Sequence, residues 1–188
     1  DSLLNEEIVI SRTGYTGELG YEILGTHEII KLIWKKCIAL GAIPCGLASR
    51  DILRLEMKYC LHGNEIDINI NPIQANLNWI VDMNKENFIG KGAINRELMK
   101  NNKSKLIAFK MLERGIPRTS YNIYIDNKLV GKVTSGTHSP SLNIGIGLGY
   151  IKENYIKDKQ KIQIEIREKR YNGIIFNKPF INNNSLFN

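Results

Sequence analysis

The sequence predicts an α+β fold, with a mixed region over residues 1–100 followed by an antiparallel β-barrel or jelly-roll-like domain over residues 101–188. The first region alternates strand-like segments with amphipathic helical ones, whereas the second holds short strand-like segments separated by turn signals. Regular short strands of this kind are typical of a small barrel or sandwich. Between the two regions, NNKSK (101–105) is a polar stretch suited to a domain junction.

The first region begins with an expected β-hairpin. EEIVISRTGYT (6–16) has the β-branched composition of a strand, GYEILG (20–25) is its expected partner, and glycines in the connecting turn supply positive-φ positions. Two helices should follow. HEIIKLIWKKCIALGA (27–42) has apolar residues at helical spacing, and GLASRDILRLEMKYC (46–60) predicts a second helix.

After these helices, the sequence predicts a polar loop over 62–70, a strand over 76–83 around Trp79, and a short helix within 88–100. The strands expected in the second region are residues 105–112, 122–126, 129–136, 144–151 and 161–176. The last of them contains Asn172-Gly173, the strongest hairpin signal in the chain. SGTHSPSLN (135–143) is expected to form a long loop.

The composition limits the classes of function. No apolar run approaches the roughly 18 residues that span a bilayer. Cys37, Cys45 and Cys60 form no tight pair, which fits a reducing compartment. Cys60 and His62 supply two ligands where structural zinc takes about four, so we expect no metal site. The chain does not begin with Met and its first residues run almost directly into a strand, so we expect it to come from the middle of a longer protein.

The charge is unevenly distributed. Residues 1–100 hold 11 Lys and Arg against 13 Asp and Glu, and residues 101–188 hold 15 against 6, giving net charges of −2 and +9. A basic region can attract nucleic acid, an acidic protein or a polyanionic ligand. However, no arginine-rich stretch or RNP-like aromatic pair accompanies the charge, and abundant lysine is also typical of solvated faces. We therefore do not expect nucleic acid as a partner.

Tyr15 and Glu22 are the first candidate site residues. In the expected hairpin they lie on facing strands, just below the turn. A tyrosine ring beside a carboxylate suits a flat heterocycle, because the ring offers a π face and the carboxylate accepts two parallel N–H bonds. The alternative is a glutamate that faces solvent on an edge strand, and the spacing alone favours this alternative. Glu18 is interpreted as an ordinary turn residue.

Arginines provide the next candidates. Arg50 lies just inside the second predicted helix, and Arg54 follows on the same helix face, where a surface position is the default expectation. Asp51 is not expected to face either of them. RGIPR (114–118) places Arg114 and Arg118 around a Gly and a Pro between two strands, which fits either a rigid basic connection or an anion contact.

Common catalytic motifs are absent. The sequence contains no GxSxG, Walker-type loop, HExxH or strand–GxGxxG–helix unit. GIGLGY (145–150) is glycine-rich, but it lies among strands with no helix after it, so we interpret it as a strand whose glycines permit close backbone packing. No catalytic residue is therefore assigned in this chain.

The order of several segments resembles a known family. RTGYTGELGYEI (12–23), GLASRDILRLEMKYCLHGNEID (46–67), NPIQANLNWIVD (71–82), then FIGK, RGIPR and KVTSGTHSPSLNIGIGLGYI (132–151) are similar, in this order, to the aminomethyltransferase, or T-protein, of the glycine cleavage system. The resemblance covers nearly the whole chain, but only the C-terminal half of a full-length family member. A related tRNA-modification branch should carry a KGCYxGQE-like motif, and this sequence has FIGKGAIN at that place.

The resemblance implies tetrahydrofolate-dependent aminomethyl transfer. The family takes an aminomethyl group from the lipoyl arm of the H-protein, releases ammonia and forms 5,10-methylenetetrahydrofolate. The implied partners are lipoylated H-protein and tetrahydrofolate, in the cytoplasm of a bacterium or the mitochondrial matrix of a eukaryote. Two alternatives stay open: the folate domain of a dimethylglycine or sarcosine dehydrogenase-like enzyme, and a non-catalytic folate- or RNA-binding protein.

The resemblance also implies roles for single residues. Glu22 matches the glutamate that holds the N–H edge of the pterin, Tyr15 matches a tyrosine of the same pocket, and Arg50 matches a folate-contacting arginine. Trp79 is expected to pack beneath the pocket. Arg114 and Arg118 remain candidate anion contacts.

One part of the family's reaction centre has no counterpart in this sequence. The family's key aspartate belongs to the N-terminal half, and the mixed region of the family is built from both halves of the chain. We therefore expect residues 1–100 to leave unpaired strand edges and exposed apolar faces.

Overall fold

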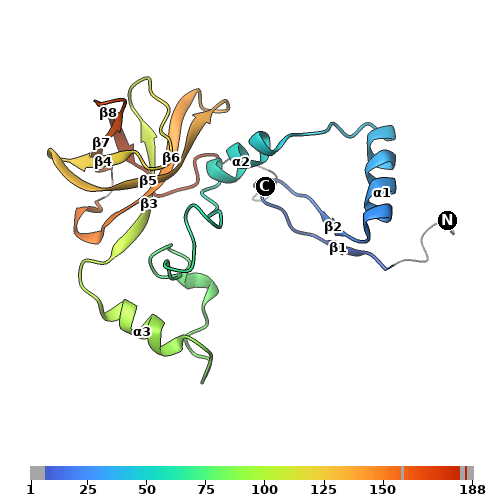
Figure 1. The fold of residues 1–188 in the computed structure, drawn as a ribbon, viewed down its shortest axis with the longest axis horizontal. Helices are drawn as coiled ribbons and strands as arrows, with labels where there is room; N and C mark the ends of the chain where they lie inside the picture. Colours follow the sequence, from blue (N-terminus) through green and yellow to red (C-terminus); the bar gives the residue numbers. More distant parts are fainter. Residues whose placement is uncertain (1–6, 158, 183–184, 186–188) are drawn as a thin grey trace.

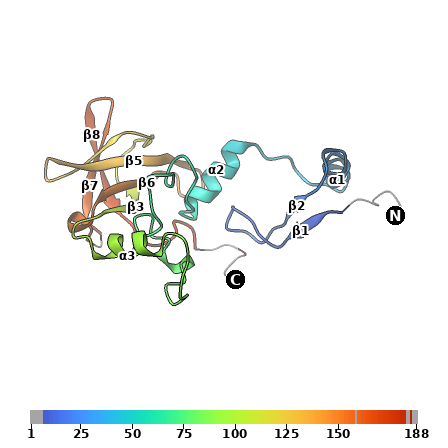
Figure 2. The ribbon, with the colours of Figure 1, turned by 60° about the horizontal axis from the view of Figure 1, so that its bottom comes forward.

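The computed structural model describes residues 7–157, 159–182 and 185. A β-barrel formed by residues 104–175 stands at one end, and an arm formed by residues 9–39 extends away from it (Figure 1). The elements before the barrel are β1 (Val9–Ser11), β2 (Glu22–Leu24), α1 (His27–Ala39), α2 (Leu47–Glu56) and α3 (Lys91–Met99). The barrel strands are β3 (Ser104–Met111), β4 (Asn122–Ile125), β5 (Lys128–Ser139), β6 (Ile144–Lys152), β7 (Lys161–Ile166) and β8 (Lys169–Ile175). Helix α2 lies between the arm and the barrel in Figures 1 and 2.

The six barrel strands close in the order β3-β6-β5-β4-β7-β8, with antiparallel neighbours and β8 paired to β3. This confirms the predicted α+β class with a C-terminal antiparallel barrel, whereas the division of the chain at residue 101 stays a prediction. Alternate residues of β3 face opposite sides, as strand geometry requires. Ile107 and Phe109 belong to the interior cluster, while Leu106 and Ala108 pack with Leu55 of α2 on the outside.

Glycines of β6 allow close packing inside the barrel. A Cβ atom at Gly147 would lie 2.5 Å from Cζ of Phe109, and one at Gly145 would lie 2.3 Å from the carbonyl oxygen of Gly115. Neither position has room for a side chain. The interpretation of GIGLGY as a closely packed strand is therefore confirmed.

All three helices predicted in the first region form, but those expected over 27–42 and 46–60 end earlier than expected. Helix α1 ends at Ala39. Gly41 follows with a φ of 98°, and Ala42 N donates to Cys37 O at 3.0 Å in a Schellman arrangement. Helix α2 ends at Glu56 in the same way, with a φ of 62° at Lys58 and Tyr59 N donating to Arg54 O at 2.8 Å. A lysine in the left-handed conformation costs about 1 kcal/mol. The sequence has no glycine at this position, so it gave no local signal for the end of α2.

Three predicted elements are wrong. The single strand expected over 161–176 is two strands, β7 and β8, joined by a turn at Arg167 and Glu168, and the Asn172-Gly173 hairpin signal lies inside β8. The strand expected over 76–83 is instead a single 3₁₀ turn at Asn78–Ile80, because a short apolar run is compatible with either structure and this one finds no partner strand among the described residues. The loop expected over 135–143 is mostly strand: β5 continues to Ser139, which pairs with Ile144 of β6. The side chains of Ser135 and Ser139 form hydrogen bonds with Arg54 and Glu56 of α2, and Ser139 Oγ also accepts one from Leu142 N in the turn before β6.

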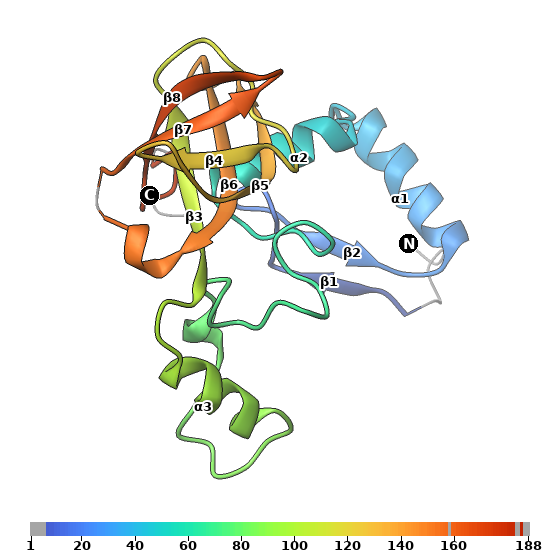
Figure 3. The same ribbon diagram turned by 60° about the vertical axis from the view of Figure 1, so that its left-hand side comes forward.

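Few residues of the arm are buried. β1 and β2 form a two-stranded sheet, and Ile29 is the only buried residue of α1. Val9, Ile10, Leu24 and Trp34 are each more than half exposed. The arm and α3 both stand away from the barrel in Figures 1 and 3. These open edges and apolar faces agree with expectation. No helix in the described part of the chain is long and apolar enough to cross a membrane.

Candidate functional site

Tyr15 is the centre of the candidate site. It lies in the loop after β1, and its hydroxyl donates a hydrogen bond to the carbonyl oxygen of Cys60. Its ring stacks on Tyr59 with centroids 5.7 Å apart, and the guanidinium of Arg50 lies 4.4 Å from its centroid. A cation–π contact of this kind stabilises by roughly 0.5–2 kcal/mol. The structure thus brings together Tyr15 and Arg50, which are 35 positions apart.

Glu22 occupies a different position from the one its spacing predicted. It pairs with Ser11, the last residue of β1, so Tyr15 lies beyond the paired strands and does not face Glu22 across them. The glutamate is exposed, and its Oε2 accepts a hydrogen bond from Thr13 Oγ1 at 2.5 Å. Within the described residues, its other carboxylate oxygen has no hydrogen-bond partner. One oxygen of Glu22 is therefore open to a ligand.

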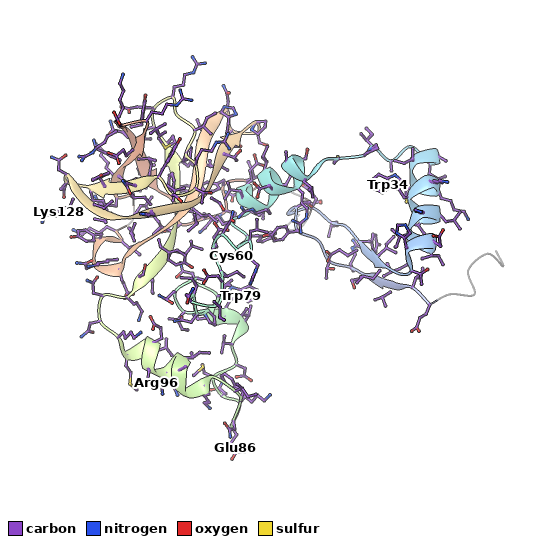
Figure 4. All side chains as sticks on the ribbon, viewed as in Figure 1. Trp34, Cys60, Trp79, Glu86, Arg96 and Lys128 are labelled. Atoms are coloured by element: carbon purple, nitrogen blue, oxygen red, sulfur yellow. The ribbon has the colours of Figure 1, made fainter. Side chains whose placement is uncertain are left out.

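A cavity of about 870 Å³ lies between Tyr15 and the outer face of the barrel. Most of its lining is apolar or aromatic, including Tyr15, Tyr59 and Trp79, with Leu106 and Leu148 from β3 and β6. Figure 4 labels two lining residues, Cys60 and Trp79.

Trp79 was expected to pack beneath the cavity, but the structure places it in the cavity wall. Its side chain is 78% exposed, and it forms part of the wall.

A smaller hollow adjoins this cavity. Its volume is about 60 Å³, and Thr13, the partner of Glu22, is among its lining residues. Gly14 and Tyr59 line both spaces. The partner of Glu22 therefore lies next to residues that also line the larger cavity, although Glu22 itself lines neither space.

The Tyr15 hydroxyl and the nearby Cys60 thiol are held in their neutral forms. Burial and, to a smaller extent, the negative charge of Glu65 raise the pKa of the Cys60 thiol to about 11. Burial is also the main cause that raises the pKa of Tyr15. A neutral thiol is a poor nucleophile and metal ligand. No group of three or more potential metal ligands occurs in the part of the chain that the structure describes.

Sequence reasoning missed a buried ionic network on α2. Arg54 is fully buried, and its Nη1 donates to Glu65 Oε2 at 2.8 Å. Its Nη2 donates to Ser135 Oγ of β5 at 2.9 Å, and its Nε donates to Asp51 Oδ1 at 2.7 Å. The expectations of a surface Arg54 and of an Asp51 that cannot face it are both wrong, because residues three apart meet on a helix.

The electrostatics of this network keep Arg54 charged. Burial acts to lower the pKa of Arg54, but the charges of Glu65 and Asp51 outweigh it and the pKa is raised. The other oxygen of Glu65 accepts from Thr134 Oγ1 at 2.6 Å, and Leu61 N donates to Oε2 at 3.0 Å. A buried charge pair with satisfied hydrogen bonds is costly to break. No local pattern pointed to Glu65, because its partners come from three separate segments.

Glu56 makes a second connection between α2 and the barrel. Ser139 Oγ donates to its Oε1, Ser141 Oγ donates to its Oε2 at 3.3 Å, and Phe180 N donates to its carbonyl oxygen at 2.8 Å. Together with the Arg54 network, these bonds fix the C-terminal end of α2. Arg50, one turn before Arg54, is thereby carried to its position over Tyr15.

Arg114 and Arg118 belong to a separate place. Both line a cavity of about 500 Å³ at the barrel, and neither lines the cavity beside Tyr15. The six candidate residues therefore fall into two groups, with Tyr15, Arg50, Glu22 and Trp79 on the arm side of the barrel.

Two family models match the chain. One, described as the GCVT N-terminal domain, matches residues 2–85, and the other, described as the glycine cleavage T-protein C-terminal barrel domain, matches residues 105–182. An aminomethyltransferase of Prochlorococcus marinus (strain NATL2A) is 43% identical over 176 residues, covering 93% of this chain and 47% of the relative. One of Halothermothrix orenii is 42% identical over 184 residues, covering 96% and 52%.

A solved structure agrees with these matches. The glycine cleavage system aminomethyltransferase T from Bartonella henselae superposes with a TM-score of 0.87 at 31% identity, covering 93% of this chain and 50% of that one. The chain thus spans about half the length of the relatives that it matches. Sequence, barrel topology and structural likeness agree, and the chain belongs to the glycine cleavage T-protein, or aminomethyltransferase, family.

Proposed function

We propose that this chain forms the folate-clamping C-terminal half of a tetrahydrofolate-dependent aminomethyltransferase. The reaction takes an aminomethyl group from the lipoyl arm of H-protein and gives 5,10-methylenetetrahydrofolate and ammonia. The observation that carries the proposal is the meeting of Tyr15 and Arg50, through a contact of 4.4 Å, beside a large cavity with aromatic walls. Relatives named aminomethyltransferase support the reaction class.

The cavity fits the chemistry of tetrahydrofolate. Ligand pockets of roughly 300–1,000 Å³ lined mostly by apolar and aromatic groups suit a molecule of this size, and the cavity of about 870 Å³ lies in that range. Tyr15, Tyr59 and Trp79 offer ring faces to flat parts of the ligand. The smaller hollow, lined by Thr13, the partner of Glu22, shares Gly14 and Tyr59 with the cavity.

Each residue then has a distinct task. The Glu22 carboxylate accepts N–H bonds from the pterin edge, using the oxygen that Thr13 leaves open. Arg50 offers a guanidinium to an electron-rich part of the folate, with its direction set by Tyr15. The Arg54 network keeps Arg50 in place. The proton-handling aspartate of the family is expected in the N-terminal half, so the chain supplies binding and orientation.

The setting of the protein is part of the proposal. Lipoylated H-protein is the proposed donor, and the positive charge of residues 101–188 favours an acidic carrier or the polyglutamate tail of folate. We propose the bacterial cytoplasm as the location, because the named relatives come from bacteria and Cys37, Cys45 and Cys60 are free thiols.

Calorimetry of tetrahydrofolate binding tests the proposal. This chain would be combined with the N-terminal half of a relative, and Glu22→Ala is expected to weaken binding by about 2–5 kcal/mol, as when one partner of a charge-assisted pair is lost. Glu28→Ala is the matched control, because Glu28 is an exposed acid on α1. Unchanged affinity in Glu22→Ala would remove Glu22 from the folate site.

A further inference from the structure

A second concave site lies on the barrel, away from the residues discussed above. Its cavity of about 500 Å³ is lined by four cationic side chains, Arg114, Arg118, Arg167 and Lys169, and by no carboxylate. All four are exposed, and none takes part in an ion pair within the described residues. Charges of one sign in a concave surface concentrate the electric field there. We call this the rim cavity.

The first wall of the rim cavity is a fixed loop between β3 and β4. A Cβ atom at Gly136 would lie 2.6 Å from the carbonyl oxygen of Pro117, so the loop rests directly on β5. Ser120 N donates to Val133 O at 2.8 Å, which anchors the loop again three residues later. Arg114 and Arg118 therefore project from a well-anchored backbone rather than from a loose tail.

The second wall is the tight turn between β7 and β8. Arg167 and Glu168 have φ values of 49° and 65°, as in the type I′ turns that join paired strands. Glu168 is not part of the lining. Glu113, another nearby acid, accepts hydrogen bonds from the backbone and side chain of Asn172 at 2.8 and 2.7 Å. These two carboxylates therefore do not fill the rim cavity.

We propose that the rim cavity binds a small polyvalent anion that carries phosphate groups. Guanidinium forks match phosphate oxygens bidentately, and three arginines with one lysine provide charge for more than one phosphate group. The size of the cavity is that of a small-molecule site. Tyr121, Tyr171 and Ile166 add partly apolar walls for an organic portion of the ligand. This site is independent of aminomethyl transfer, because it shares no lining residue with the cavity beside Tyr15.

The test is calorimetric titration of the 188-residue chain with inorganic tripolyphosphate at about 0.15 M salt, where exposed charges beyond about 8 Å are screened. The double variant Arg114→Gln/Arg167→Gln should weaken binding at least about tenfold, since it removes two bidentate donors. The control Lys128→Gln/Lys132→Gln removes the same charge from exposed positions outside the rim cavity, and it should change affinity by less than about twofold. Lys128 stands at the edge of the barrel in Figure 4. Circular dichroism would verify that both variants fold.

Three results would overturn the proposal. One is the absence of measurable binding by the unmodified chain. Another is an equal loss of affinity in both double variants, which would mean that only overall charge matters. The third is tighter binding of a glutamate-rich peptide or a single-stranded oligonucleotide than of tripolyphosphate, lost in the same site variant, which would assign the rim cavity to a macromolecule.

Discussion

Removing the charge of Glu65 should destabilise the chain severely. Glu65 and Arg54 are both fully buried and meet at 2.8 Å, so Glu65→Gln leaves a buried guanidinium whose remaining anionic partner, Asp51, is half-exposed. Breaking a buried pair on one side costs about 3–5 kcal/mol. The lower end applies because an amide oxygen can still accept from Arg54 and Asp51 still pairs with it. We expect a loss of about 3 kcal/mol in the free energy of unfolding, out of a typical total of about 5–15 kcal/mol.

Urea denaturation followed by circular dichroism measures this loss. With a slope of roughly 1–3 kcal/mol per molar urea, the midpoint should fall by at least about 1 M. Glu153→Gln is the matched control, because Glu153 pairs with Lys105 at 2.9 Å with a side chain that is 36% exposed, and it should cost less than about 1 kcal/mol. Replacing Arg54 and Glu65 together by methionine should recover most of the stability. Equal midpoints for Glu65→Gln and Glu153→Gln would refute the structural role of the network.

Three further predictions concern other parts of the chain. Gly147→Ala should destabilise the barrel by about 1–3 kcal/mol through overpacking against Phe109. Gly20→Ala should not, because its Cβ would meet only ordinary contacts at 3.9 Å; equal urea midpoints would contradict this. Cys60 should react with a thiol reagent more slowly than exposed Cys37 and Cys45 near pH 8, because its pKa of about 11 keeps it protonated, and mass spectrometry of the labelled peptides would expose an error in this order. Because the pKa of Cys60 in the folded chain exceeds the usual 9.0, the folded state should lose stability as pH rises from about 9 to 11. The +9 charge of residues 101–188 should make association with an acidic carrier slower as salt rises, and a rate that ignores salt would exclude steering by charge.

The barrel was predictable because its signals are local. Alternating apolar residues mark each strand. The hairpin signal at Asn172-Gly173 was wrong, because both residues pair within β8 and the turn lies at Arg167 and Glu168 instead. Helix α1 likewise carries its own stop signal at Gly41. Helix α2 does not, since Lys58 adopts the left-handed conformation without being glycine. A lysine can take either the right-handed or the left-handed conformation, so tertiary packing decides where α2 ends and the sequence alone does not show it.

The sequence predicted several residues of the candidate site, but not how they are arranged. Nothing local links Tyr15 to Arg50, or Arg54 to Glu65 and Ser135, because each contact joins segments that are far apart in the chain. The expected facing pair of Tyr15 and Glu22 failed for a related reason: β1 stops at Ser11, and the chain then turns toward α2. Family resemblance supplied Tyr15, Glu22 and Arg50, whereas the Arg54 network and the arrangement of all these residues required the fold.

The bonds that join α2 to β5 have a consequence for mutations far from folate. Arg50 and Arg54 are one helical turn apart, about 6 Å along a rigid axis, and Arg54 and Glu56 both bond to serines of β5. A shift of β5 is therefore transmitted through α2 to the guanidinium over Tyr15. If the proposed function holds, substitutions inside the barrel that displace this strand should alter ligand affinity at the cavity beside Tyr15, even where the substituted residues lie outside that cavity.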